Sequence, residues 1–219
     1  LGAAVAVAAW APLAWAGFVQ EGGLRAAAAL LGGGSLAALL WACEPSSPLG
    51  QAHSGLAAQV RALRSGQRLV LDCAYAPLRL RGHPSLSADQ LARVWQLFTP
   101  NKALGLTGVR AAYAIAPLAS EAAVAALEAM CASWPVGAHG VALLEGWTQA
   151  STQAWLVQSL RSLQEWKQRQ IAILKALGWN CLDSDANFFC ARPPRPLDVV
   201  QLRQAGIKLR DASSLGLPG

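Results

Sequence analysis

Hydrophobic and polar positions alternate along the first half of the chain in short blocks. Apolar runs of strand length occupy residues 36–43, 68–72 and 92–98. Between them, residues 53–65 carry apolar positions at helical spacing, and residues 86–94 begin with Ser87, a favoured helix cap. Strands that alternate with helices in this way are typical of parallel strands joined by right-handed crossovers. The pattern therefore predicts an α/β fold with a mainly parallel sheet.

The second half of the chain is helical at first and then changes character. Residues 121–132 predict a helix, and residues 141–177 predict a helical stretch so long that we expect a break near residues 146–152. After Gly178 the predicted elements are short. They comprise strands at 179–182, 186–191 and 207–210 and a helix at 197–205.

These patterns divide the chain into three parts. We expect a large domain over residues 1–145, a connecting helical segment over 146–177 and a small α+β domain over 178–219. The first residue is Leu and the last is Gly219. Both ends are therefore expected to belong to a longer protein.

Two uncharged stretches near the N-terminus have the length of membrane spans. They cover residues 1–19 and 26–43 and are rich in Ala and Gly, and three glycines interrupt the second. Neither has Lys- or Arg-rich flanks, and the basic start of a signal peptide is missing. We therefore expect buried elements of the α/β domain and no membrane insertion.

Composition excludes several classes of protein. The chain is 54% hydrophobic and 14% charged, so it can bury a large core. Its net charge of +6 is spread along the sequence without a run of Lys and Arg, which argues against nucleic-acid binding. Five cysteines without regular spacing suggest buried, reduced thiols in a cytoplasmic protein, and three scattered histidines indicate no metal site.

Candidate catalytic residues stand at the ends of predicted strands. Ser47, Asp72 and Lys102 each fall at such an end. Ligands of parallel sheets bind beyond the carboxyl ends of the strands, so this coincidence points to one site. Lys102 is also the only lysine before Lys167, and a solitary lysine beside a buried strand suits an amine that forms a Schiff base.

A pyridoxal phosphate site would use further residues near these. It needs a buried carboxylate beside the ring nitrogen, and Asp72 has that setting. Tyr75 follows three residues later and could hold the ring oxygen. Thr99, the small-residue turn at 105–108 and Arg110 could bind the phosphate.

Two segments carry a resemblance to a known family. Residues 69–75 (LVLDCAY) and 99–110 (TPNKALGLTGVR) resemble the fold-type-I class I/II aminotransferases, and within them the histidinol-phosphate aminotransferase branch with its related threonine-phosphate decarboxylases. Residues 184–189 (SDANFF) and 206–211 (GIKLRD) are similar to two further motifs of that branch. The resemblance implies a three-layer α/β/α large domain, a small C-terminal domain, pyridoxal 5′-phosphate as cofactor and a homodimer.

The resemblance also implies a role for each site residue. Lys102 would form the Schiff base and move the proton, while Asp72 would pair with the ring nitrogen and Tyr75 with the ring oxygen. Arg110 would bind the phosphate. Arg210 would bind the acidic end of the substrate.

Other positions depart from the family pattern or leave alternatives open. Ser47 stands where the family has a ring-binding asparagine, and Asn101 stands where it commonly has a phosphate-binding serine. Asn187 would either face the ring or cap its own strand. The segments that would complete the site lie before Leu1 and after Gly219.

Three hypotheses about function follow. The first is a pyridoxal-phosphate-dependent aminotransferase that moves an amino group between an amino acid or amino-alcohol phosphate and a 2-oxo acid. The second keeps the cofactor but decarboxylates threonine phosphate, as in cobalamin synthesis. The third is a catalytically degenerate homologue, suggested by Ser47 and Asn101.

Overall fold

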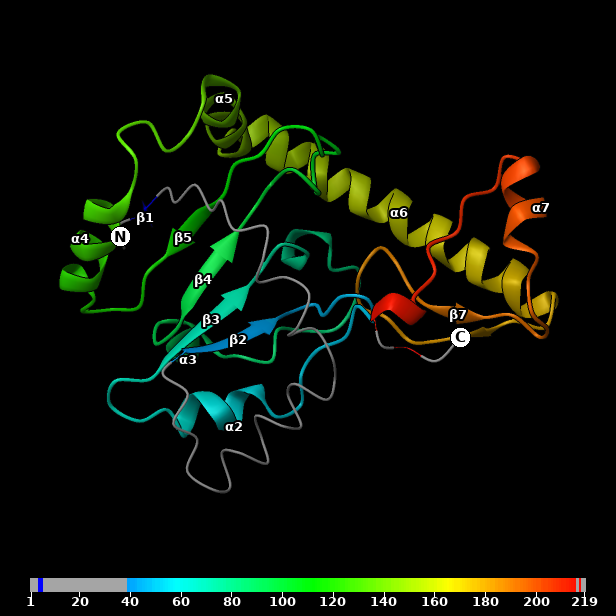
Figure 1. The fold of residues 1–219 in the computed structure, drawn as a ribbon, viewed down its shortest axis with the longest axis horizontal. Coiled ribbons are helices and arrows are strands. Elements are labelled where there is room, and N and C mark those ends of the chain that lie inside the picture. The colour runs from blue at the N-terminus through cyan, green and yellow to red at the C-terminus, as the bar shows by residue number, and fades with distance from the viewer. Residues whose placement is uncertain (1–3, 6–38, 216, 218–219) are drawn as a thin grey trace.

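A five-stranded sheet forms the centre of the computed structural model, which describes residues 4–5, 39–215 and 217 (Figure 1). The strand order is β1-β5-β4-β3-β2. Strands β2, β3 and β4 run parallel, whereas β5 is antiparallel to β4, and β1 is antiparallel to β5. The strands are β1 (Ala4–Val5), β2 (Leu39–Cys43), β3 (Arg68–Asp72), β4 (Trp95–Phe98) and β5 (Tyr113–Ile115).

The parallel register brings the predicted strand ends to one edge. Cys43 pairs with Asp72 across β2 and β3, and Asp72 pairs with Leu97 across β3 and β4. The expected mainly parallel sheet is therefore confirmed for the three strands that precede the candidate site. Residues 36–38 of the first predicted strand lie outside the described residues.

Two short helices pack against the core of this part of the sheet. They are α2 (Leu56–Arg61) and α3 (Ala88–Leu91). Leu56 and Val60 of α2 are fully buried beside Leu69 and Val94. Helix α2 is shorter than the predicted 53–65, and the Ser87 cap is confirmed, since its hydroxyl accepts the Gln90 N–H in a capping box.

The predicted break in the long helical stretch is confirmed. Two residues separate α5 (Ala138–Trp147) from α6 (Ala150–Ala176). Helix α4 (Glu121–Met130) precedes both. Figure 1 shows α6 running from beside the sheet to the C-terminal elements. This helix therefore links the sheet to the last part of the chain.

The C-terminal part contains less regular structure than its sequence suggests. It consists of β6 (Asn180–Cys181), β7 (Ala191–Arg192), α7 (Val199–Gln204) and the short 3-10 helix η2 (Ser213–Leu215). The predicted strand at 186–191 is wrong except for its last residue, because residues 184–188 form a turn with one bridge, from Ala186 to Arg79. The predicted strand at 207–210 is also wrong: these exposed residues pair with no described strand. The division into two domains and a connecting helix stays a prediction.

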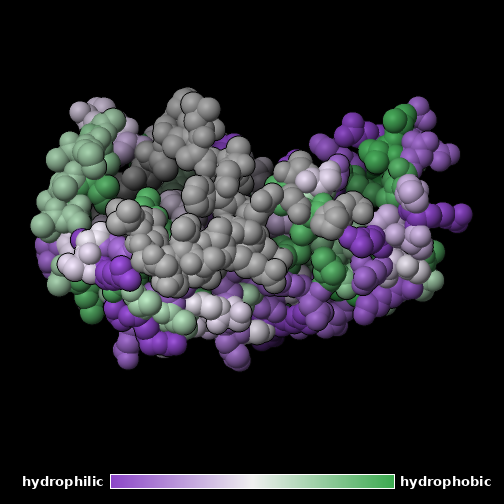
Figure 2. Space-filling model, turned by 60° about the horizontal axis from the view of Figure 1, so that its bottom comes forward, coloured by the Kyte–Doolittle hydropathy of each residue, from purple (hydrophilic) through white to green (hydrophobic). Residues whose placement is uncertain are grey.

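The surface mixes polar and apolar residues. On the face in Figure 2, hydrophobic residues gather at the end that carries α4 and again beside α7, where Met130, Val199 and Val200 are exposed. No helix within the described ranges is both long enough and apolar enough to cross a membrane. All five cysteines are unpaired, but only Cys73 is fully buried, so the expectation of buried thiols holds only in part.

Candidate active site

Lys102 and Tyr75 form the centre of the candidate site. The Nζ atom of Lys102 lies 3.9 Å from the centre of the Tyr75 ring, a cation–π contact. Tyr75 follows β3 at the start of the 3-10 helix η1 (Ala76–Leu78), and Lys102 lies in the turn after β4. The structure thus brings together two predicted site residues that are 27 positions apart in the sequence.

Helix α6 helps to place the turn that carries Lys102. Ala103 is buried in a cluster with Leu78 and with Leu156 of α6, and Tyr75 packs against the same cluster. The Leu106 N–H donates to the Asn101 carbonyl at 2.8 Å and closes the turn. Packing on both sides of Lys102 therefore restricts the backbone from which its amine extends.

Asp72 is a half-buried carboxylate at the end of β3. Its Oδ1 accepts the Ala74 N–H at 2.9 Å, and it forms no ion pair with any described residue. Burial raises the pKa of Asp72, while the Ala74 N–H and the charge of Lys102 oppose the rise. A cation beside Asp72 would relieve this cost, and a protonated ring nitrogen is such a cation.

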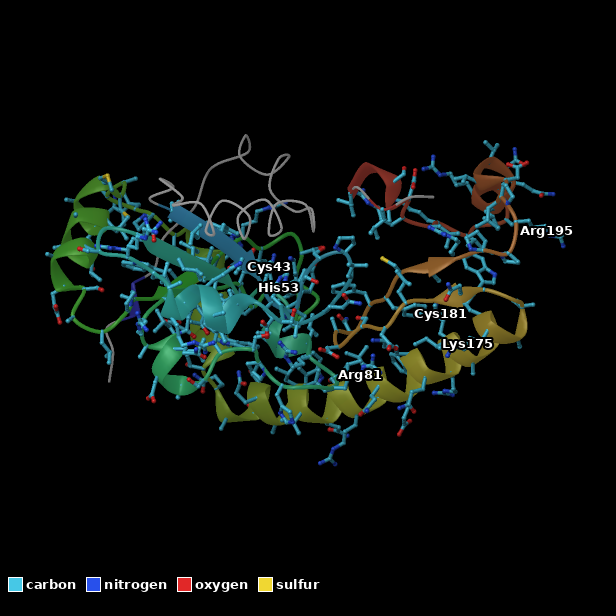
Figure 3. All side chains as sticks on the ribbon, turned by 90° about the horizontal axis from the view of Figure 1, so that it is seen from below. Cys43, His53, Arg81, Lys175, Cys181 and Arg195 are labelled. Carbon is cyan, nitrogen blue, oxygen red and sulfur yellow. The ribbon has the colours of Figure 1, made fainter. Side chains whose placement is uncertain are left out.

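Cys43 and its neighbour His53 border the site at the end of β2 (Figure 3). The Nε2 atom of His53 lies 2.7 Å from the Cys43 carbonyl oxygen. Burial, followed by the negative charge of Asp72, raises the pKa of the Cys43 thiol to about 12. A thiol in this state is neutral at physiological pH.

Thr99 and Asn101 stabilise the loop that precedes Lys102. The Thr99 hydroxyl shares its proton between the Asn101 Oδ1 at 2.8 Å and the Ala111 carbonyl at 3.0 Å. A phosphate that accepted this proton would have to displace one of these contacts. The two residues adjoin Lys102 as predicted, but the contacts described for them are internal to the loop.

Ser47 lies in the turn after β2 and is half-buried. Its backbone opposes the rise in the pKa of the Cys43 thiol, whereas no contact of its hydroxyl is described within residues 39–215. The turn is closed by the Gly50 N–H, which donates to the Ser46 carbonyl at 2.6 Å. Ser47 therefore stands on a fixed turn at the same sheet edge as Asp72.

Arg110 and Arg210 stand apart from the central residues in the described structure. Both are exposed, and neither forms an ion pair with a described residue. Arg110 precedes β5, and its carbonyl packs against Gly140 of α5. The phosphate-binding and substrate-binding roles of these arginines stay predictions.

The turn at 184–188 reaches the central pair through an aromatic ring. The Phe188 and Tyr75 rings meet edge to face with their centres 4.8 Å apart. Asn187, half-buried, precedes this ring, and no described side-chain hydrogen bond decides between its two predicted roles. Phe188 belongs to the motif at 184–189 but was not predicted as a site residue, because aromatic residues in apolar runs usually fill cores.

The residues present fit pyridoxal phosphate as a cofactor. The Lys102 amine lies over a tyrosine ring, and the desolvated Asp72 carboxylate, which forms no ion pair with a described residue, lies within electrostatic reach of that amine. These are the groups that a Schiff base and a protonated ring nitrogen need.

Comparison with known proteins identifies the family. The description "Aminotransferase class I and II" matches residues 24–219. Histidinol-phosphate aminotransferase 2 of Oceanobacillus iheyensis is 29% identical over 193 residues, which are 83% of this chain and 50% of that protein. The chain thus spans about half the length of the curated relative it matches.

Solved structures share the fold at lower identity. Histidinol-phosphate aminotransferase from Sinorhizobium meliloti, in complex with pyridoxal-5′-phosphate, matches with a TM-score of 0.69 and 24% identity over 84% of this chain and 51% of that chain. L-threonine-O-3-phosphate decarboxylase from Porphyromonas gingivalis matches with a TM-score of 0.65 and 19% identity over 82% and 56%. The likeness confirms the predicted α/β fold of type I. Since the family description covers most of the sequence, the chain belongs to the class I and II aminotransferases.

Proposed function

We propose that the protein is a pyridoxal-phosphate-dependent aminotransferase that moves an amino group between an amino acid or amino-alcohol phosphate and a 2-oxo acid. The observation that carries this proposal is the position of the Lys102 amine, 3.9 Å from the centre of the Tyr75 ring. Asp72, at the end of the adjacent strand, supplies the carboxylate that the cofactor's ring requires.

Each central residue would have a defined part in this reaction. When bound, the cofactor supplies an aldehyde that condenses with amines and a conjugated ring that accepts the electron pair left at the substrate α-carbon. Lys102 would hold the cofactor through its Nζ atom, would release it to the substrate amine and would then move the α-proton as a general base. Asp72 would keep the ring nitrogen protonated, and the Tyr75 hydroxyl would serve the ring oxygen.

The proposal extends to residues around this centre. Ser47, Thr99, Asn101 and Arg110 would contribute to cofactor binding, and Asn187 and Arg210 to substrate binding. Thr99 and Asn101 adjoin Lys102 through a hydrogen-bonded loop, which supports their part. We also propose a homodimer, as the family implies, and a cytoplasmic location, which the five unpaired cysteines favour.

An absorbance spectrum of the full-length protein tests the cofactor. Protein incubated with pyridoxal phosphate and freed of excess should absorb near the violet edge, and borohydride should abolish the band. Lys102→Ala should lack the band, whereas Lys175→Ala, which removes an exposed lysine of α6, should retain it. A wild-type protein that remains colourless would overturn the proposal and favour the degenerate homologue.

Product analysis tests the reaction. The loaded protein is incubated with a 2-oxo acid and either glutamate or threonine phosphate as amino donor. Formation of a new 2-oxo acid without carbon dioxide supports transamination. Stoichiometric carbon dioxide from threonine phosphate would instead establish the decarboxylase.

A further inference from the structure

Three segments distant in the sequence meet beside the candidate site. The Asp185 N–H donates to the Gly50 carbonyl at 2.7 Å, and the Leu80 N–H donates to the Asp185 carbonyl at 2.6 Å. The Gln51 side chain donates to the Asp183 carbonyl at 3.0 Å. The turn at 44–51, the segment at 79–82 and the segment at 183–190 are therefore joined by their backbones.

Arg79 joins two carboxylates at this junction. Its Nη2 lies 2.8 Å from Glu44 Oε1, and its Nη1 lies 3.4 Å from Asp185 Oδ2. The exposed fractions of the three side chains are 11% for Arg79, 3% for Glu44 and 20% for Asp185. One planar guanidinium thus uses two different nitrogens to hold two segments that are more than 130 residues apart.

Glu44 depends on this arrangement because it is charged and buried. Its Oε1 accepts from Arg79 and from the Ser85 N–H at 2.8 Å, whereas its Oε2 has no partner among the described residues. Burying a carboxylate is unfavourable unless a cation accompanies it. Arg79 is the cation that Glu44 pairs with in the described structure.

Each end of this bridge continues into the candidate site. The Glu44 N–H donates to the Asp72 carbonyl at 3.0 Å, and Glu44 begins the turn that carries Ser47. At the other end, Asp185 lies three residues before Phe188, the ring that meets Tyr75. A movement of Arg79 would therefore displace the turn that carries Ser47 and the segment that carries Phe188, one on each side of the Lys102–Tyr75 pair.

We infer that Arg79 is a positioning residue that fixes the turn at 44–51 to the segment at 183–190 and so seats Phe188 on Tyr75. Its consequence for cofactor affinity rests on the proposed function; the fixing of the two segments does not. Helix α6 supports the same segment, since Lys167 Nζ donates to the carbonyls of Ser184 and Ala186 at 2.7 and 2.6 Å.

A simpler role for Arg79 would be to neutralise Glu44 and nothing more. Arg79→Lys distinguishes the two roles because lysine keeps the positive charge but loses the two-armed geometry. Arg81→Lys is the comparison variant. The Arg81 side chain is 52% exposed, and its described contacts all lie in the segment at 183–190: Asp183 at 3.1 Å, the Ser184 carbonyl at 3.1 Å and Asp185 at 3.4 Å. Figure 3 shows Arg81 beside α6.

Hydrogen–deuterium exchange of the full-length protein without cofactor is the first measurement. Arg79→Lys should accelerate exchange about tenfold in the peptides covering 44–51 and 183–190, the scale expected when one charge-assisted hydrogen bond is lost. Arg81→Lys should change exchange in 44–51 by less than about twofold, because the contacts described for Arg81 lie in 183–190. Exchange equal to wild type in Arg79→Lys would overturn the inference.

The affinity for pyridoxal phosphate, measured by absorbance titration, is the second measurement. Arg79→Lys should weaken the affinity about tenfold, the scale expected for the loss of one hydrogen bond. Arg81→Lys should leave the affinity unchanged. Unchanged affinity in Arg79→Lys would also overturn the inference. Should the wild type bind no cofactor, the proposed function fails and the exchange data alone decide the inference.

A second variant serves if Arg79→Lys does not fold. The double variant Glu44→Gln/Arg79→Met removes both charges together and leaves no buried charge unpaired. It should fold and should accelerate exchange in both segments. Wild-type exchange in this variant would overturn the inference.

Discussion

The Lys102 amine lies 3.9 Å from the centre of the Tyr75 ring. The Phe188 ring also contacts Tyr75, edge to face, with the two ring centres 4.8 Å apart. A lysine, a tyrosine and a phenylalanine from three separate segments thus form one contact group. The cation–π contact contributes about 0.5–1 kcal/mol at such a partly exposed position. Its larger effect is to hold the amine at the sheet edge where Asp72 ends its strand.

Two substitutions of Tyr75 separate its hydroxyl from its ring. Tyr75→Phe keeps both ring contacts, so the free energy of unfolding should change by less than about 0.5 kcal/mol. The affinity for pyridoxal phosphate should fall about tenfold because one hydrogen bond is lost. Urea unfolding and absorbance titration measure the two effects.

Tyr75→Leu removes the ring as well. The loss of the edge-to-face and cation–π contacts should destabilise the protein by about 1–2 kcal/mol. A stability equal to that of Tyr75→Phe would show that the ring contacts contribute nothing.

Asp72→Asn should stabilise the protein without cofactor at neutral pH. Burial raises the pKa of Asp72 above its ordinary value of 3.8, so the folded carboxyl retains its proton to higher pH than the unfolded one. The folded state consequently loses stability as the pH rises above 3.8 through the folded pKa, and Asn removes this loss. Urea unfolding should show a gain at pH 7 that shrinks toward pH 4.

The control for Asp72→Asn is Glu165→Gln, which alters an exposed acid of α6. Its free energy of unfolding should follow wild type at both pH values. A destabilised Asp72→Asn at pH 7 would contradict the assignment of burial as the dominant cause. Asp72→Asn should also fail to bind a functional cofactor, because the introduced amide could not keep the ring nitrogen protonated.

Gly50 should tolerate no side chain. Its φ of +68° is strained for other residues, and a Cβ there would clash with Ser184 Oγ. Gly50→Ala should therefore lower the free energy of unfolding by about 2–4 kcal/mol, combining backbone strain with a clash.

Two other glycines separate these causes. Gly66 has a φ of +84° but open space around it, so Gly66→Ala should cost about 1 kcal/mol from strain alone. Gly55 has a φ of −92° and open space, so Gly55→Ala should change stability by less than about 0.5 kcal/mol. Equal losses of unfolding free energy in Gly50→Ala and Gly66→Ala would show that the contact with Ser184 contributes no steric penalty.

Cys43 and Cys73 should resist alkylation in the folded protein. Burial is the main cause that raises each thiol pKa to about 12 from 9.0. The thiolate fraction at pH 8 then falls by about a thousandfold. Mass spectrometry after brief iodoacetamide treatment should find the half-buried Cys131 modified and these two unmodified, and labelling of Cys43 at the rate of Cys131 would contradict the prediction.

The sequence was sufficient to predict the strands that lead into the site. The apolar run at 68–72 matches β3 in full, and the Ser87 cap is present, because both depend on local periodicity and on hydrogen bonds within a few residues. Asp72 and Lys102 were predicted at neighbouring strand ends, and the parallel register of β2, β3 and β4 confirms that arrangement. Family motifs added the cofactor and the roles.

Short elements near the C-terminus were predicted less well. Residues 186–191 were expected as a strand, yet their first residues form a turn in which the Ser184 hydroxyl bonds the Phe188 carbonyl and accepts the Ala186 N–H. Apolar composition suggested a strand, but a local side-chain hydrogen bond competed with pairing. The stretch at 207–210 alternates apolar and charged residues, a strand pattern, but no strand lies beside it in the described structure.

What the sequence determined by itself is which residues have suitable chemistry: a solitary lysine, a carboxylate and a tyrosine at strand ends. Only the tertiary structure decided that Phe188 reaches Tyr75 and that Arg79 joins Glu44 to Asp185. Phe188 and Tyr75 are 113 positions apart in the sequence, and Arg79 and Asp185 are 106 positions apart. No local pattern encodes such pairings, because they arise from the packing of the 183–190 segment against the sheet edge.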